Sequence, residues 1–193
     1  MKRDLSKPLS RGAARTTSDF TRAFFDLLAQ ASFESITVNS LCERASYPRA
    51  TFYNYFDDKY DLLNYCWLWL SQQIHLEEHA SLAHDEALYI YFDRIYDFTT
   101  ENSDLIQRIL AHNPETGQMF LSFRTFMDAQ MRRIFSHCTV SDQWSIPQEI
   151  IANHYSNTLL LVWQWCYLKD VTVTRAQAHH YLHVLLDGIQ AAQ

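Results

Sequence analysis

The segment from Pro48 to Phe56 reads PRATFYNYF, and most of its side chains can take part in nucleic-acid recognition. Arginine and asparagine form paired hydrogen bonds with guanine and adenine edges, while hydroxyl groups bind phosphates. In a helix, Phe52 and Phe56 lie four residues apart and point together into a core. The other surfaces of that helix hold Arg49, Ala50, Thr51, Tyr53, Asn54 and Tyr55. An ordinary packing helix is the alternative, but this mixture of exposed groups favours a helix that reads DNA.

The residues before this segment predict the elements that position it. Apolar residues recur at helical spacing from Phe20 to Ala31 and predict a supporting helix over 17–31. Thr37 is a suitable N-cap for a second, short helix that ends at Ala45. A tight turn at 46–47 then leads to Pro48, which is tolerated in a first helical turn. Two short helices joined by a four-residue turn, behind a longer helix, are typical of a helix-turn-helix.

The charge distribution also favours a nucleic-acid partner. The whole chain has a net charge of −6, but residues 1–60 carry nine Lys or Arg and seven Asp or Glu, a net +2. The remaining residues therefore carry −8. Residues 1–15 are polar and basic without periodicity, and we interpret them as a flexible arm. A basic N-terminal part and an acidic remainder are expected when only one end of a protein contacts phosphates.

Residues 17–63 resemble the DNA-binding domain of the TetR (tetracycline-repressor-like) family. The resemblance rests on a helix with paired aromatic residues, the pattern TVxxLxxRA over 37–45, and the string RATFYNYF followed by DDKYDLL over 49–63. It is strong over about a quarter of the chain and looser over the rest. It implies an all-α protein with a DNA-binding domain at 1–60 and an effector-binding and dimerisation domain at 61–193.

The resemblance also implies a role for each matching position. Thr37 and Lys59 are expected to contact phosphates, and Tyr55 to hydrogen-bond the DNA backbone. The positions expected to face the major groove are Arg49, Ala50, Thr51, Tyr53 and Asn54. Two residues depart from the family pattern, because Ser46 stands where Gly is usual and Pro48 where Ser or Thr is usual. Ser46 costs about 1 kcal/mol in a left-handed turn, and Pro48 offers no capping hydroxyl.

The C-terminal part of the chain predicts further helices at roughly 59–79, 85–100, 103–111, 115–136, 147–168 and 175–190. Residues 61–193 contain eighteen aromatic side chains, mostly at core spacing. The resemblance implies a pocket among them for a small apolar or aromatic effector, whose lining residues the sequence does not identify. It also implies a dimer interface on the last two helices. The expected interface residues are Ile151, Tyr155, Leu159, Val162, Tyr181, Leu182, Leu185 and Ile189.

Other classes of function find less support in the sequence. No stretch is long and apolar enough to span a membrane, and the N-terminus lacks the apolar region of a secretory signal. The four cysteines form no CxxC pair, which favours a reduced protein of the cytoplasm. His75 to His79 matches the HxxEH pattern of some zinc hydrolases, but a third ligand is not evident. We therefore expect no metal, no cofactor and no enzymatic activity, with a zinc hydrolase as the remote alternative.

The resulting hypothesis is a ligand-responsive repressor that binds a palindromic DNA operator as a homodimer. The main alternative is a DNA-binding factor of the same fold that answers to a protein partner.

Overall fold

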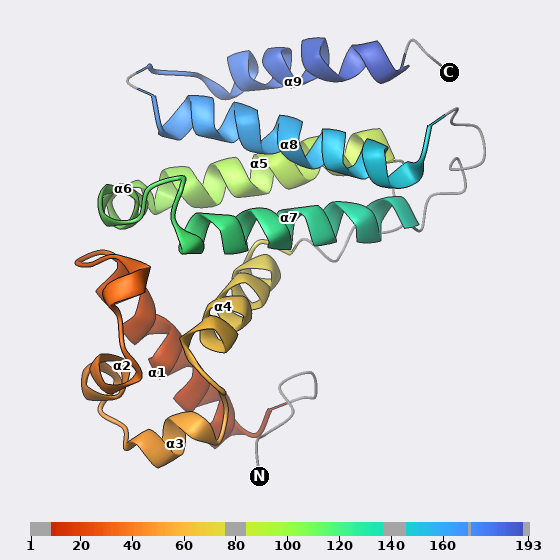
Figure 1. Ribbon diagram of the computed structural model, residues 1–193. Coiled ribbons are helices and arrows are strands. Elements are labelled where there is room, and N and C mark those ends of the chain that lie inside the picture. Colours follow the sequence, from red (N-terminus) through yellow and green to blue (C-terminus); the bar gives the residue numbers. More distant parts are fainter. Residues whose placement is uncertain (1–8, 76–83, 137–145, 170, 191–193) are drawn as a thin grey trace. The chain divides into compact units, whose positions relative to one another are not determined.

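A computed structural model of the chain describes residues 9–75, 84–136, 146–169 and 171–190, and its described elements are all helical (Figure 1). This confirms the predicted all-α class. None of the described helices is long and apolar enough to cross a membrane. In chain order the elements are α1 (Arg11–Leu28), the 3-10 helix η1 (Phe33–Ser35), α2 (Val38–Ala45), α3 (Arg49–Tyr53), α4 (Lys59–Gln73), α5 (His84–Glu101), α6 (Ser103–His112), α7 (Gln118–Ser136), α8 (Gln148–Tyr167) and α9 (Arg175–Gln190).

The chain forms two compact units, and each of them combines two separate stretches of the sequence. Unit 1 comprises Met1–Leu70 and Asn102–Phe123, and unit 2 comprises Ser71–Glu101 and Arg124–Gln193. α6 and the beginning of α7 therefore pack with the N-terminal helices, which the predicted boundary at residue 60 did not anticipate. How DNA binding and effector binding are divided between the units stays a prediction.

The first helix begins earlier than the sequence analysis predicted. Ser10 is the N-cap, and its Oγ accepts a hydrogen bond of 3.4 Å from the amide of Ala13. Thr16 lies inside the helix, where its hydroxyl donates to the carbonyl of Gly12. Residues 11–15 are thus helical, and the prediction of a flexible arm was wrong for them. The helix ends at Leu28, and η1 follows as a turn that the sequence pattern did not predict.

The side-chain amide of Asn113, in the connection between α6 and α7, links several segments of unit 1. Its Oδ1 accepts a hydrogen bond of 2.7 Å from the amide of Phe33. Its Nδ2 donates to the carbonyls of Leu28 at 3.0 Å, Ile109 at 2.9 Å and Ala31 at 3.3 Å. Asn113 is only 2% exposed. One buried side chain therefore satisfies backbone groups at the end of α1, in η1 and in α6, which would otherwise lack partners.

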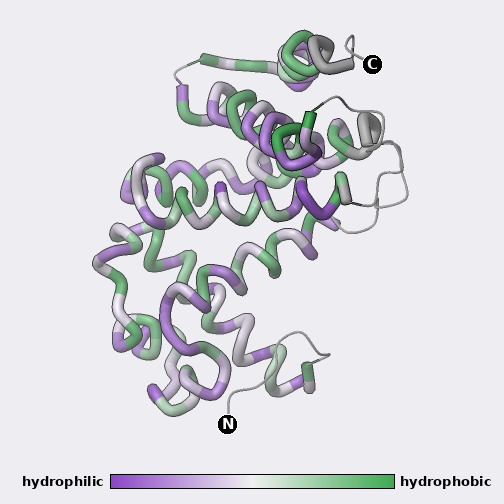
Figure 2. The backbone as a smooth tube through the Cα atoms, turned by 45° about the vertical axis from the view of Figure 1, so that its right-hand side comes forward, coloured by the Kyte–Doolittle hydropathy of each residue, from purple (hydrophilic) through white to green (hydrophobic). Residues whose placement is uncertain are grey.

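Unit 2 has an apolar core formed by α5, α7, α8 and α9. Hydrophobic and hydrophilic residues alternate along the helices in Figure 2, as expected for amphipathic helices that bury one face. At the edge of this core His179 Nε2 lies 2.6 Å from Asp93 Oδ1, and Arg175 pairs with Asp97. The core consists of Leu88, Tyr91, Phe92, Met131, Phe135, Ile151, Ala152, Tyr155, Leu159, Val162, Ala178, Leu182 and Leu186.

This core corrects the predicted dimer interface. The buried residues Ile151, Tyr155, Leu159, Val162 and Leu182 are at most 2% exposed within a single chain, so they have no surface left for a partner. Tyr181 is half-buried, Leu185 is 44% exposed, and the side chain of Ile189 lies outside the described residues. Five of the eight predicted residues thus lie on the inward faces of their helices, because apolar periodicity alone does not distinguish a core from an interface; a dimer interface on these helices stays a prediction.

Candidate nucleic-acid interface

The turn between α2 and α3 has the local geometry of a helix-turn-helix. Thr37 caps α2 as predicted, since its Oγ1 accepts from the amide of Ser40 at 3.1 Å while Ser40 Oγ accepts from the amide of Thr37 at 3.0 Å. Ser46 ends α2 in the left-handed region, with φ 60° and ψ 40°. The left-handed turn conformation expected at this serine is therefore confirmed. Pro48 precedes α3 without a side-chain cap, and its carbonyl accepts the first hydrogen bond of the helix from the amide of Thr51 at 2.9 Å.

An aromatic cluster fixes α3 against α1. Phe52 is fully buried, and the centroid of its ring lies 5.4 Å from that of Phe20 and 5.4 Å from that of Phe56. The hydroxyl of Tyr47, in the turn, donates to Asp19 of α1 at 3.0 Å. α3 has only five residues, too few for a stable isolated helix, so these contacts determine which of its faces reaches solvent.

The outward face of α3 carries most of the side chains predicted to read DNA. Arg49, Ala50, Tyr53 and Asn54 are exposed, and Thr51 is half-buried. Asn54 lies at the C-cap of α3, because the helix ends three residues earlier than the sequence predicted. Tyr55 is different. It is only 6% exposed and packs in the core, which removes the support for its predicted contact with the DNA backbone.

Lys59, at the start of α4, points into the domain. Its Nζ donates three hydrogen bonds of 2.9 Å, to the carbonyls of Phe33, Glu34 and Ile36. The ammonium also lies 4.7 Å from the centroid of the Phe33 ring. Burial lowers the pKa of Lys59, and the nearby Glu34 carboxylate opposes this shift. An ammonium has three donors, and all three are used here. The geometry therefore assigns Lys59 to the connection between α1 and α2 and gives no support to the predicted phosphate contact.

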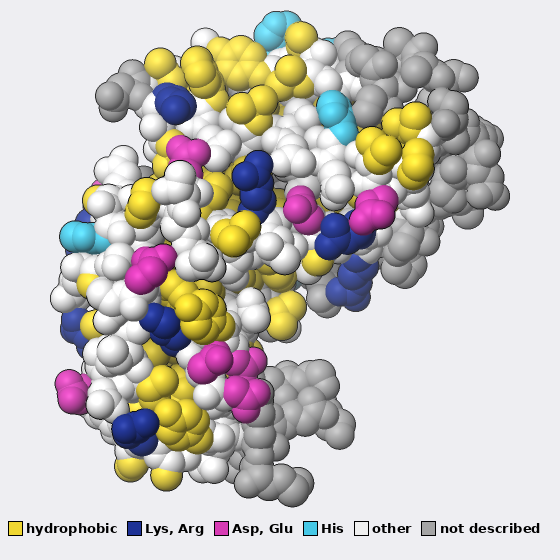
Figure 3. All heavy atoms as spheres, viewed as in Figure 1, with side chains coloured by type: hydrophobic (Ala, Val, Ile, Leu, Met, Phe, Trp, Pro, Cys, Tyr) yellow, Lys and Arg dark blue, Asp and Glu magenta, His cyan; other side chains and the backbone are white. Residues whose placement is uncertain are grey.

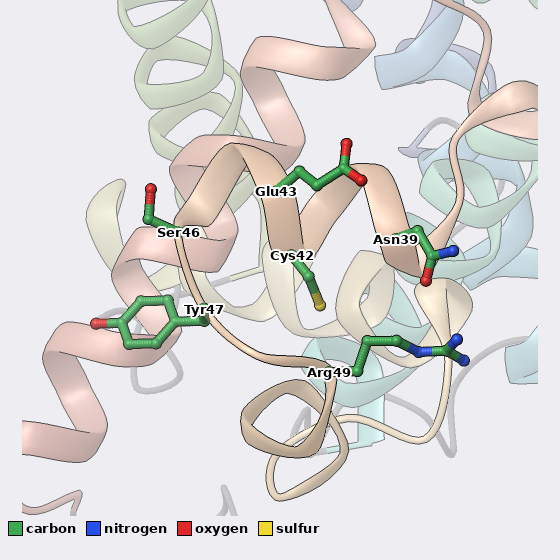
Figure 4. A pocket seen from close by; sticks show the side chains of 6 residues that line it. All are labelled: Asn39, Cys42, Glu43, Ser46, Tyr47 and Arg49. Carbon is green, nitrogen blue, oxygen red and sulfur yellow. The ribbon is translucent and has the colours of Figure 1, made fainter.

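A groove between α2 and α3 brings together residues that the sequence analysis missed. Asn39, Cys42 and Glu43 line it from α2, and Arg49 lines it from α3 (Figure 4). Ser46 and Tyr47 of the turn complete the lining. Cys42 is 5% exposed, and burial raises the pKa of its thiol, an effect that Arg49 partly opposes. Asn39 and Glu43 are four residues apart on a helix whose inward face holds Leu41. This spacing could have indicated from the sequence that the two side chains share an outer face of α2.

The other candidate chemistry is not supported by the described residues. Among them there is no group of three or more metal-ligating side chains. The HxxEH motif at 75–79 lies outside them except for His75, which is exposed. Cys42 and Cys66 are buried free thiols, and Cys166 is a half-buried one.

Comparison with known proteins agrees with this geometry. Residues 21–66 match the family model described as bacterial regulatory proteins, tetR family. No curated protein matches the chain by sequence. Among solved structures, a putative TetR-family transcriptional regulator from Syntrophomonas wolfei is 16% identical, with a TM-score of 0.60 over 93% of this chain and 95% of that one.

Two further solved structures are similar over most of their length. A putative fatty acid metabolism regulator from Clostridium perfringens is 15% identical, with a TM-score of 0.57 over 89% of this chain and 98% of that one. The flavonoid-responsive regulator FrrA is 20% identical, with a TM-score of 0.58 over 93% and 97%. At these identities the likeness shows a shared fold.

Proposed function

Because residues 21–66 match the model of the tetR family of bacterial regulatory proteins, we propose that this chain is a homodimeric repressor of that family that binds a palindromic DNA operator. In this proposal two copies place their α3 helices in successive major grooves, about 34 Å apart along the duplex. A small molecule bound by the C-terminal helices favours a conformation in which the two helices no longer fit. The site of action is the cytoplasm, where the operator lies.

The observation that carries this proposal is the outward face of α3. Phe52 anchors the helix in the core, and that contact leaves Arg49, Tyr53 and Asn54 exposed. Arginine and asparagine are the residues that bind guanine and adenine edges in pairs of hydrogen bonds. A helix held rigidly by one face and carrying these groups on the other is suited to enter a major groove.

The test compares the affinity for the operator with the affinity for a scrambled duplex, which separates recognition of bases from sequence-independent binding. Arg49→Ala and Asn54→Ala are expected to weaken binding to the operator by about 1–3 kcal/mol for each paired base contact. Because each change is present in both protomers, the effect per dimer approaches twice this value. Binding to a scrambled duplex changes much less. The measurement is fluorescence anisotropy with both duplexes at several salt concentrations, with the operator taken from selection on random DNA.

Asn64→Ala, an exposed asparagine on α4, is the matched control and should leave both affinities unchanged. If the folded Arg49→Ala and Asn54→Ala variants bind every duplex as tightly as the wild type, α3 does not read DNA and the proposal fails.

The exposed apolar residues of α8 and α9 support the dimer. Ile150, Leu161 and Trp165 are 46–55% exposed and share one face of α8, while Val184 and Leu185 are 58% and 44% exposed on α9. Hydrophobic side chains gather in Figure 3 where Figure 1 places these two helices. Apolar surface of this kind marks an interaction site, and a two-fold axis lets the same patch serve both copies.

Leu161→Glu is therefore expected to convert the dimer into a monomer of 22.8 kDa, because it places two charges in an apolar interface. Sedimentation equilibrium at micromolar concentration measures the change. Leu121→Glu is the control, since Leu121 is 54% exposed but lies on α7 in unit 1. A wild-type protein that sediments only as a monomer, or a Leu161→Glu variant that remains a dimer, would contradict this interface.

The proposed effector is a small apolar or aromatic molecule bound by unit 2. Unit 2 buries several aromatic side chains, a composition that suits an apolar or aromatic ligand. Within it Asn153 Oδ1 and His154 Nε2 are buried without a hydrogen-bond partner among the described residues. A ligand with a suitably placed polar group would satisfy them. Thermal-shift screening with apolar and aromatic compounds, followed by operator binding, tests the effector against the alternative of a protein partner.

A further inference from the structure

The groove between α2 and α3 contains a contact that bears on how the protein selects its operator. Arg49 Nη2 donates a hydrogen bond of 3.2 Å to the hydroxyl of Tyr53, one helical turn further along α3. The guanidinium carbon also lies 5.8 Å from the centroid of the Tyr53 ring. Both side chains are exposed, and the hydroxyl contact raises the pKa of Arg49 above its already high value. The contact with Tyr53 thus restricts the conformations of the Arg49 side chain on the surface of α3 before DNA arrives.

The contact with Tyr53 leaves the Arg49 guanidinium enough N–H donors to bind a guanine. Arginine has five N–H donors, and the Tyr53 hydroxyl accepts only one of the two on Nη2. The second Nη2 hydrogen and those of Nη1 remain for O6 and N7 of a guanine. A side chain that is already ordered loses less conformational entropy on binding, so the contact gains affinity and becomes more selective in geometry.

The neighbours of Arg49 favour a base edge over a phosphate. Glu43 lines the same groove, and its carboxylate repels phosphate oxygens but can accept a hydrogen bond from the amino group of cytosine. Asn39 of α2 lies toward the same end of the groove as the Arg49 guanidinium (Figure 4). An asparagine amide can pair with an adenine edge.

We propose that the α2–α3 groove is a two-helix reading unit, in which Tyr53 positions Arg49 to recognise a guanine and Asn39 recognises an adjacent base pair. The inference rests on the proposed DNA-binding function and extends it to the bases that are read. Tyr53 acts through Arg49 and is a positioning residue. A tyrosine that contacted a phosphate directly would behave differently, because its loss would weaken all DNA sequences equally.

The experiment combines selection on random duplexes with a double-mutant cycle. Selection with the wild-type protein is expected to fix a guanine at one position in each half-site. Changing that guanine should weaken binding about 10- to 100-fold, as for other paired arginine contacts. Tyr53→Phe should reduce this preference about threefold to tenfold, while the affinity for the guanine-free duplex and the salt dependence stay the same. In an Arg49→Ala background, adding Tyr53→Phe should change nothing.

The matched controls remove the same groups elsewhere in unit 1. Tyr60→Phe removes an exposed tyrosine hydroxyl from α4, and Asn64→Ala removes an exposed asparagine amide. Both should leave the selected sequence unchanged, whereas Asn39→Ala should broaden it at one base pair next to the guanine.

Three outcomes would contradict the proposal or its premise. If Tyr53→Phe weakens binding to both duplexes equally, or has its full effect in the Arg49→Ala background, Tyr53 does not position Arg49. An unchanged selected sequence for Asn39→Ala overturns the two-helix unit. A wild type that prefers no duplex would instead refute the DNA-binding function itself.

Discussion

Replacing Asn113 with alanine is expected to lower the free energy of unfolding by about 3–5 kcal/mol, because it leaves several buried backbone groups without partners at about 1–3 kcal/mol each. The amide of Phe33 loses its 2.7 Å acceptor, and the carbonyl of Leu28 loses a donor at 3.0 Å. At 2% exposure, water cannot replace these hydrogen bonds without opening the domain. Urea denaturation of wild type and variant, at one fixed protein concentration, measures the difference.

The neighbouring residue gives the control for Asn113. His112 is exposed at the end of α6, so His112→Ala should change stability by less than about 0.5 kcal/mol. Asn113→Asp should be at least as damaging as the alanine variant, since a carboxylate has no donor for the carbonyls that Nδ2 now satisfies. A stability loss below about 1 kcal/mol for Asn113→Ala would mean that these hydrogen bonds contribute little.

The contrast between Asn113 and Phe52 illustrates which parts of the fold the sequence predicts. Phe52 and Phe56 were correctly assigned to the core, because their spacing places both on one helical face and their neighbours within 40 residues provide the other side. Asn113 contacts residues 80–85 positions away. No local pattern distinguishes an asparagine that bridges such a distance from one that merely ends a helix. The same limit concealed the inclusion of α6 in unit 1.

Similar reasoning explains the differences in the site. Tyr55 and Lys59 were assigned to DNA by resemblance, and both side chains are polar enough to serve there. Their environments favour a structural role, since Tyr55 is buried and Lys59 Nζ meets three carbonyls. Arg49 and Tyr53 do lie on the outer face, but their mutual contact depends on rotamers that spacing does not specify. Helical faces are therefore predictable from sequence, while the partners of long polar side chains are not.

Replacing Lys59 with methionine is expected to lower the free energy of unfolding by about 2–4 kcal/mol, because hydrogen bonds to charged groups contribute about 1.5–3 kcal/mol and the variant removes three of them at partly exposed acceptors. The three carbonyls belong to the segment that joins α1 to α2. Methionine retains most of the apolar packing against the Phe33 ring, so the change in the free energy of unfolding measures the contribution of the ammonium group. Lys169→Met, which makes the same change at an exposed lysine, should cost less than about 0.5 kcal/mol.

The DNA-binding measurement distinguishes this structural role from a phosphate contact. If Lys59 held a phosphate, Lys59→Met would lower the slope of log affinity against log salt by about one unit for each phosphate that it no longer neutralises, and Lys59→Arg would preserve the slope. The observed geometry leads to the opposite pattern. The slope should stay at the wild-type value for both variants, measured well below the melting temperature. Lys59→Arg should still reduce stability by about 1–2 kcal/mol, because a planar guanidinium cannot direct donors at three carbonyls that converge on one nitrogen. A reduced slope in Lys59→Met, with stability unchanged in Lys59→Arg, would return Lys59 to the DNA interface.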